Sequence, residues 1–183
     1  MSLEAQHTNP QPVGPTPPAK TAGSAPTPTA VAPTAPPPPE VIPVPDCLAQ
    51  FVVPFQGVPF TLKGYHAAVS VGCDLVVPAA ELLDKEGFAL DTITGVDWLA
   101  EGQMEIVYDY FHPVTGLRAV VRTRVPREKP ELPTISNVFP GANWHERETH
   151  DFFGIQFNGH PNLTPFLLPE NATIHPLRKD FQA

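Results

Sequence analysis

Three stretches in the middle of the chain alternate apolar and polar residues, the spacing typical of strands with one buried face. They run from Phe88 to Trp98, from Met104 to Phe111 and from Leu117 to Val125. The turn at 112–116, HPVTG, joins the second stretch to the third as a hairpin. We therefore predict an antiparallel run of three strands.

The two faces of the third strand differ in chemistry. One face is apolar and the other carries three arginines, so we predict one buried and one basic face. The two sets are Leu117, Ala119 and Val121 on one side, and Arg118, Val120, Arg122 and Arg124 on the other.

The residues before this hairpin add a helix and further strands. Ala67–Val77 is rich in valine and predicts one strand. Pro78–Glu86 predicts a short helix, with proline in its first turn and Gly87 just past its end. Pro45–Tyr65 mixes apolar runs with Pro and Gly, which favours short extended pieces at a sheet edge. The predicted fold class is α+β, with a mixed or antiparallel sheet and packed helices.

After the proline-broken connection Pro126–Pro140, the pattern predicts a helix from Trp144 to Phe153. Asn143 is a suitable N-cap, Glu146 stands where a capping box places its glutamate, and Gly154 ends the helix.

The spacing within this helix predicts how its side chains group. Trp144, Glu148 and Phe152 share a face, and Arg147 and Asp151 form an i,i+4 pair beside them. Glu148 is thus expected to be partly desolvated between two aromatic rings and to need a donor. That donor belongs either to a neighbouring subunit or to an acid/base site, and a proton-relay role for Glu148 is the alternative to an interfacial ion pair.

Beyond Gly154 the chain is rich in Pro, Gly and His and has no periodicity of its own. Such a segment cannot bury its own apolar residues, so we expect a long extended tail that lies on a partner. Arg178 and Lys179 give it a cationic end that suits an acidic partner surface. These features predict one subunit of a larger complex rather than a free-standing enzyme.

The first 45 residues contain 14 of the 26 prolines and no aromatic residue. We interpret 1–45 as a disordered Pro/Ala-rich tether, 46–135 as the α+β domain and 136–183 as the helix with its partner-binding tail. Prolines interrupt every candidate signal peptide, and Lys20 is the only basic residue of the tether.

Charge and composition exclude several classes. The net charge of −8 argues against binding to nucleic acid. Two cysteines, Cys47 and Cys73, are too few for an iron–sulfur cluster or a cysteine-rich zinc site, and we expect them to be reduced. No stretch approaches transmembrane length, so contact with a membrane would be made through partners.

His145, Glu146 and His150 resemble a zinc-binding helix, but the histidines are five residues apart, about 140° round the helix. We therefore expect both to be surface or interface residues. His160, which precedes Pro161, is interpreted as a turn and packing residue rather than a quinone ligand.

Four blocks of sequence resemble one known family. They are GANWHERETHDFFGIQFNGHPNL at 141–163, HPLRKD at 175–180, GVDW at 95–98 and PTIS at 133–136. Together they resemble the small hydrophilic peripheral-arm subunit of respiratory complex I, the NADH:quinone oxidoreductase. The similarity extends from about Leu75 to the end of the chain.

The resemblance implies a non-catalytic scaffold subunit with no cofactor of its own. FMN, the iron–sulfur clusters and the quinone would be bound by partner subunits, on the cytoplasmic side of a bacterial inner membrane. Its partners would be the quinone-site large subunit and adjacent iron–sulfur subunits. A related subunit of membrane-bound nickel–iron hydrogenases and formate hydrogenlyase-type complexes is the alternative. The predicted partner interface comprises Trp144, Glu146, Arg147, Glu148, Asp151, Gly154, Gly159, His160, Pro161, Arg178, Lys179 and Asp180.

Overall fold

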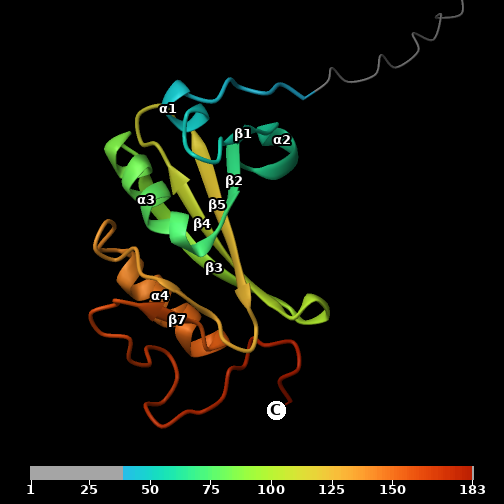
Figure 1. Ribbon diagram of the computed structural model, residues 1–183, viewed down its shortest axis with the longest axis vertical. Coiled ribbons are helices and arrows are strands. Elements are labelled where there is room, and N and C mark those ends of the chain that lie inside the picture. The colour runs from blue at the N-terminus through green and yellow to red at the C-terminus, as the bar shows by residue number, and fades with distance from the viewer. Residues whose placement is uncertain (1–38, 183) are drawn as a thin grey trace, which may run out of the picture. The chain divides into compact units, whose positions relative to one another are not determined.

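The computed structural model describes residues 39–182, so most of the predicted tether lies outside the described residues. Five strands form one sheet in the order β1-β2-β5-β4-β3 (Figure 1). Their bounds are Gln56–Gly57 for β1, Ala67–Val71 for β2, Ala89–Trp98 for β3, Gln103–Phe111 for β4 and Arg118–Pro126 for β5.

The sheet is mixed. β3, β4 and β5 form an antiparallel meander, and the predicted hairpin at 112–116 is confirmed, with Gly116 at φ 72°. β2 pairs with β5 in parallel and β1 pairs with β2 antiparallel at the edge. The α+β class and the edge position of the Pro45–Tyr65 region are therefore confirmed.

Two helices contribute to the core on one face of this sheet. The ten-residue α3 (Val76–Lys85) and the twelve-residue α4 (Ala142–Phe153) both contribute to a core that contains Met104, Ile106 and Tyr108 of β4. On β5, Ala119, Val121 and Val125 are buried in that core, while Arg118 and Arg122 are only half-buried and Arg124 is exposed. Val120 is an exception on the basic face, because it is 1% exposed.

Several local expectations were wrong. The strand predicted over Ala67–Val77 ends at Val71, and a 3₁₀ turn, η1 (Cys73–Leu75), leads into α3. The Pro45–Tyr65 region also contains two single-turn helices, α1 (Asp46–Ala49) and α2 (Phe60–Lys63), and another 3₁₀ turn, η2 (Leu99–Glu101), follows β3. Each is three or four residues long, too short for a periodic pattern to reveal.

The connection Pro126–Pro140 contains a strand that the sequence did not predict. β6 (Glu131–Pro133) pairs in parallel with β7 (Gln156–Asn158), which follows α4 directly. The two strands of this sheet precede and follow α4 in the chain, and their pairing places Thr134 and Ile135 next to α4.

α4 begins two residues earlier than predicted, at Ala142. Gly141 is its N-cap, and no side chain caps it, so the expected capping box of Asn143 and Glu146 is wrong. The expected end is confirmed, since Gly154 adopts the left-handed conformation with φ 73°. Within residues 39–182 no helix is long and apolar enough to cross a membrane.

Candidate partner-binding site

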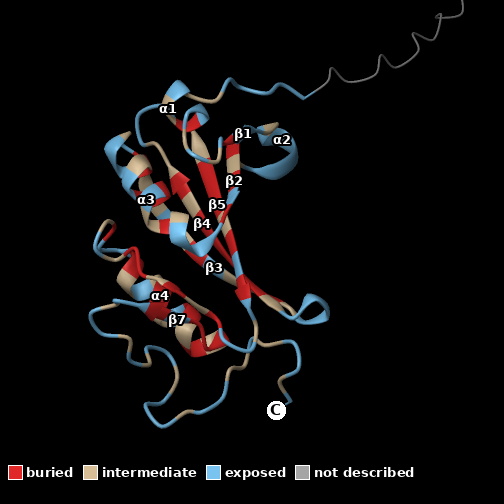
Figure 2. Cartoon of the chain, in the orientation of Figure 1, coloured by how far each residue is buried: buried red, intermediate tan, exposed pale blue. Residues whose placement is uncertain are grey.

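The predicted interface residues on α4 divide into exposed and buried sets. Trp144 is 54% exposed and Glu148 is also exposed, whereas Glu146 is 0% and Asp151 is 4% exposed. Figure 2 shows the buried stripe of α4 against its exposed side. The expected desolvation of Glu148 is therefore wrong for the chain by itself, and it is Glu146 that is desolvated. Whether these residues meet a partner stays a prediction.

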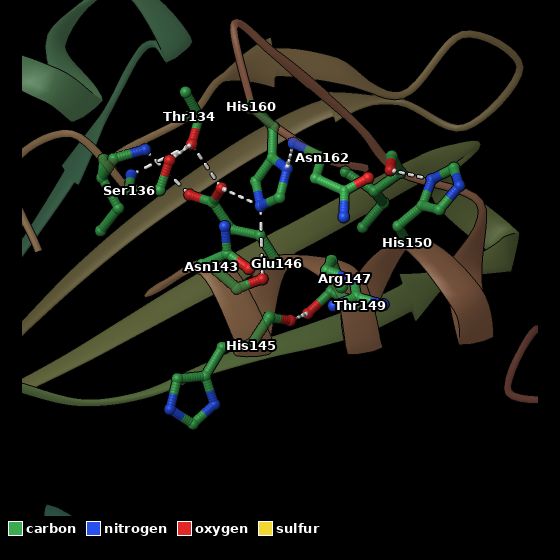
Figure 3. A network of polar contacts seen from close by, with 12 residues as sticks. Thr134, Ser136, Asn143, His145, Glu146, Arg147, Thr149, His150, His160 and Asn162 are labelled. Carbon is green, nitrogen blue, oxygen red and sulfur yellow. Dashed lines mark hydrogen bonds and ion pairs between the residues drawn. The ribbon is translucent and has the colours of Figure 1, made fainter. Parts of the chain in front are cut away.

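Glu146 holds α4 against the segment that follows β6 (Figure 3). Its Oε2 accepts a hydrogen bond from the Thr134 hydroxyl at 2.5 Å, and its Oε1 accepts one from the backbone N–H of Ile135 at 2.8 Å. Burial raises the pKa of Glu146 to about 7, although these two donors act in the opposite direction. The carboxyl group can therefore bind or release a proton near neutral pH without a change in its partners.

His160 contacts the same carboxyl group. Its side chain is fully buried, with Nε2 3.3 Å from the carbonyl oxygen of Asn143 and 3.8 Å from Glu146 Oε2. Because Nδ1 accepts a hydrogen bond from the N–H of Asn162, the neutral ring carries its proton on Nε2, the tautomer assigned from these contacts. Burial lowers the pKa of His160, so the contact is not an ion pair at neutral pH. The packing role predicted for His160 fits this arrangement.

A second polar cluster anchors the first part of the tail. Asp151 Oδ2 accepts hydrogen bonds from the backbone N–H groups of residues 166, 167 and 168, at 2.7, 2.7 and 3.2 Å. Burial acts to raise the pKa of Asp151, but the three donors and nearby His150 hold it below its ordinary value. The carboxylate therefore fixes the turn at Phe166–Leu168.

Arg147 binds the same part of the tail from the other side. Its Nε and a terminal nitrogen donate to the carbonyl oxygens of Thr164 and Pro165 at 2.9 and 2.8 Å. The guanidinium carbon also lies 5.2 Å from the ring centre of Trp144 and 5.1 Å from that of Phe166. The predicted Arg147–Asp151 pair is therefore wrong, because each side chain holds the tail instead.

The end of the tail returns to α4 and then to the sheet. Arg178 Nε donates to the carbonyl oxygen of Phe153 at 2.7 Å, and Leu177 N donates to that of Phe152 at 3.2 Å. Gly154 leaves room for this return, because a Cβ at that position would lie 2.5 Å from His175 Nε2. The expectation that the whole tail needs a partner to lie on is therefore wrong for this stretch.

The end of the tail also contacts Asp97 on β3. Asp97 forms a two-point ion pair with Arg127, at 2.8 and 3.1 Å, and also accepts the N–H of Lys179 at 2.9 Å. Arg127 pairs with Asp180 as well. Sequence reasoning missed Arg127, although a carboxylate at the buried side of β3 was a signal that a cation must lie nearby.

Three of the remaining predicted interface residues lie in or beside these clusters. Gly159 and Pro161 are exposed on either side of His160, and Lys179 extends its Nζ to 5.7 Å from the ring centre of Trp98. His145 and His150 do not converge, because the His150 ring contacts the carbonyl oxygen of Ile155 at 2.9 Å. Among residues 39–182 no group of three or more acidic, His or Cys side chains is arranged to hold a metal ion. Cys47 and Cys73 are both free thiols.

The tail exposes apolar side chains even though its backbone is anchored. The exposed fractions are 41% for Phe166, 54% for Leu167, 49% for Ile174 and 53% for Leu177. With Trp144 they lie outside the core. These exposed apolar side chains are candidates for contact with a partner.

Comparison with known proteins gives consistent matches. A family model described as the 30 kDa subunit of respiratory-chain NADH dehydrogenase matches residues 69–183. The NADH-quinone oxidoreductase subunit designated C of Roseiflexus sp. (strain RS-1) is 44% identical over 92 residues, which are 50% of this chain and 53% of that protein. Its counterpart in Moorella thermoacetica is 39% identical over 117 residues, 59% of this chain and 78% of that protein.

One solved structure has the same fold at moderate sequence identity. It is a chain of the membrane-bound sulfane sulfur reductase, described as an archaeal respiratory membrane complex, with a TM-score of 0.66 and 30% identity. The match covers 75% of this chain and 82% of that one. The chain spans about half the length of the first curated relatives it matches. The family match covers β3–β5, α4 and the whole described tail, so the chain belongs to the family of the 30 kDa subunit of respiratory-chain NADH dehydrogenase.

Proposed function

We propose that this chain is a scaffold subunit in the peripheral arm of a proton-translocating NADH:quinone oxidoreductase. In this role it supports electron transfer from NADH through FMN and iron–sulfur centres to quinone, while partner subunits bind all of those groups. The observation that carries the proposal is the family match over residues 69–183, which includes both anchored clusters and the exposed apolar tail.

The partners in this proposal are the quinone-site large subunit and the adjacent iron–sulfur subunits. The tail suits such a role, since Asp151 and Arg147 bind backbone polar groups of the tail, and Arg178 of the tail binds the backbone of α4. Its apolar side chains then remain available to a neighbour. Binding costs little further backbone entropy, because this backbone is already held in place. The chain would reach the cytoplasmic side of a bacterial inner membrane through these partners.

A second candidate is the equivalent subunit of a membrane-bound nickel–iron hydrogenase or formate hydrogenlyase-type complex. The structural match supports this second candidate, because the matched chain belongs to a respiratory membrane complex that is named for sulfane sulfur reduction rather than for NADH oxidation. In either case the reaction is set by the large partner subunit. Two Cys pairs that bind nickel in that partner would identify a hydrogenase.

The test is a pull-down of the tagged full-length chain from gently solubilised membranes, with every co-purifying chain identified by mass spectrometry. A flavoprotein, iron–sulfur subunits and a large subunit without nickel-binding Cys pairs would support the first candidate. A large subunit with those pairs would support the second. A chain recovered alone, from membranes that contain the complex, would contradict both.

A further inference from the structure

β3 is the edge strand of the main sheet opposite β1. It pairs with β4 from Ala89 to Trp98, with a bulge between Leu90 and Thr92, and has no strand on its other side among the described residues. Its centre, Thr92 to Val96, contains no charged residue and no proline. Natural edge strands usually carry such residues to prevent further pairing. The centre of β3 therefore offers unpaired backbone groups to another strand.

A groove of about 180 Å³ runs between this edge and α4. The β3 side is formed by Thr92–Gly95, and the α4 side by residues that include Glu148 and Phe152, with Leu177 of the tail closing it. Gly95 lets the helix approach so closely, because a Cβ there would lie 2.6 Å from Phe153 Cδ2.

Glu148 gives the groove a negative rim. The side chain is exposed and forms no ion pair within residues 39–182. Asp91 and Asp97, on either side of this part of β3, are already paired with Arg118 and Arg127. The available charge is therefore that of Glu148, in a chain whose net charge is −8.

We propose that the edge of β3 and this groove bind an extended segment of a partner subunit, which adds to the sheet as a further strand. The segment places a Lys or Arg side chain against Glu148 and an apolar side chain on Phe152 and Leu177. Side chains two residues apart on a strand lie on one face, about 6.6 Å from each other, which suits both contacts. The proposal rests on the proposed function, because it requires the chain to have partner subunits.

A photo-crosslinking amino acid at Thr94 in the full-length tagged chain, expressed in cells that assemble the complex, tests this. The matched control is the same amino acid at Val114, which is 87% exposed at the tip of the β4–β5 hairpin. We expect Thr94 to crosslink one partner peptide that contains Lys or Arg, and Val114 not to crosslink that peptide.

Variants of Glu148 then test the charge. Glu148→Lys should lower the Thr94 crosslink yield at least about fivefold, and Glu148→Gln should give an intermediate yield, since interfacial charge pairs contribute at least about 1 kcal/mol. Glu81→Lys, the same change on the exposed side of α3, should leave the yield unchanged. Partners that co-purify without a Thr94 crosslink, or a yield that Glu148→Lys does not lower, would overturn the inference and leave the proposed function standing. A chain recovered alone would overturn both.

Discussion

Within residues 39–182 no cation balances the carboxylate of Glu146. His160 is neutral, Arg147 is directed to the tail, and the buried tyrosines Tyr108 and Tyr110 carry no charge, since burial raises the pKa of each. The folded protein therefore favours the protonated carboxyl group, whose O–H can donate to the Thr134 hydroxyl. This situation makes stability depend on pH between 4.5 and about 7.

The direction of this pH dependence follows from the difference in proton binding between the folded and the unfolded chain. The pKa of Glu146 is about 7 in the folded chain and 4.5 when unperturbed. Between these values the unfolded chain loses the proton and the folded chain keeps it, so the free energy of unfolding falls as pH rises. Each pH unit in this range lowers the free energy of unfolding by about 1.36 kcal/mol. The total decrease is about 3 kcal/mol; it begins above pH 4.5 and is complete above pH 7.

Glu146→Gln should remove this dependence, because the amide imitates the protonated carboxyl group. We expect the variant to gain up to about 3 kcal/mol relative to the parent between pH 5 and pH 8. Urea unfolding across that range measures the difference. Glu148→Gln, a change at an exposed carboxylate on the same helix, serves as control and should show no comparable trend. A parent–variant difference that stays constant with pH would rule out this account of Glu146.

Asp151 behaves in the opposite way, because three backbone donors stabilise its charge. Asp151→Ala leaves those N–H groups without their acceptor, at a cost of about 2–4 kcal/mol for hydrogen bonds to a charged group. Amide exchange at 166–168 should then accelerate at least about 30-fold, as hydrogen-exchange mass spectrometry can measure. In the parent, these amides should lose protection only as the pH falls below the ordinary pKa of an aspartate. Unchanged exchange in the variant would mean that the turn does not depend on Asp151.

At the scale of elements, the contact between β3 and α4 depends on Gly95. A Cβ there would meet Phe153 at 2.6 Å and Thr149 at 3.0 Å, and the Phe153 ring is buried, so it has little room to move. We expect Gly95→Ala to lower the free energy of unfolding by about 1–3 kcal/mol, the usual cost of overpacking. Gly141→Ala is the control, since nothing lies within 4 Å of its added Cβ and its φ of −62° suits alanine. Equal stability of the two variants in thermal unfolding would contradict this role of Gly95.

The elements that the sequence predicted are those with long local patterns. β3, β4 and β5 are nine or ten residues long. α3 ends two residues before Gly87 and α4 ends directly before Gly154, the two glycines identified in advance. β6 and β7 are three residues each, and their pairing joins segments on either side of α4. No periodicity can reveal strands of that length, because their formation depends on the partner strand rather than on their own residues.

The sequence placed several residues of the candidate site on α4 but did not predict their contacts. Helical spacing placed Glu146, Arg147 and Asp151 on α4 correctly, yet it assigned Glu146 to a cap and the other two to each other. The actual partners are Ile135, the carbonyl groups of Thr164 and Pro165 and the backbone at 166–168, which are 11 to 18 residues away in the sequence. Spacing within a helix carries no information on contacts at that range.

At the scale of the whole described chain, Asp97 and Arg127 connect three distant segments: β3, the end of β5 and the end of the tail. The Asp97 side chain is 1% exposed, and the Arg127 side chain is 15% exposed. Burial acts to raise the pKa of Asp97, but Arg127 and the N–H of Lys179 hold it below its ordinary value. The pair therefore fixes the tail to the sheet only while Asp97 is ionised.

Arg127→Ala should be far more harmful than removal of the tail's own carboxylate. It leaves Asp97 buried without its cation, which costs about 3–5 kcal/mol, whereas Asp180→Asn removes one exposed partner and should cost under about 1 kcal/mol. Asp97→Asn combined with Arg127→Ala should recover part of the loss, because no buried charge is left unpaired. Denaturant unfolding of the parent, the three single variants and the double variant measures this coupling. If the double variant were as unstable as the sum of its two single changes, Asp97 and Arg127 would act independently, and the tail would have to be fixed to the sheet by its backbone contacts alone.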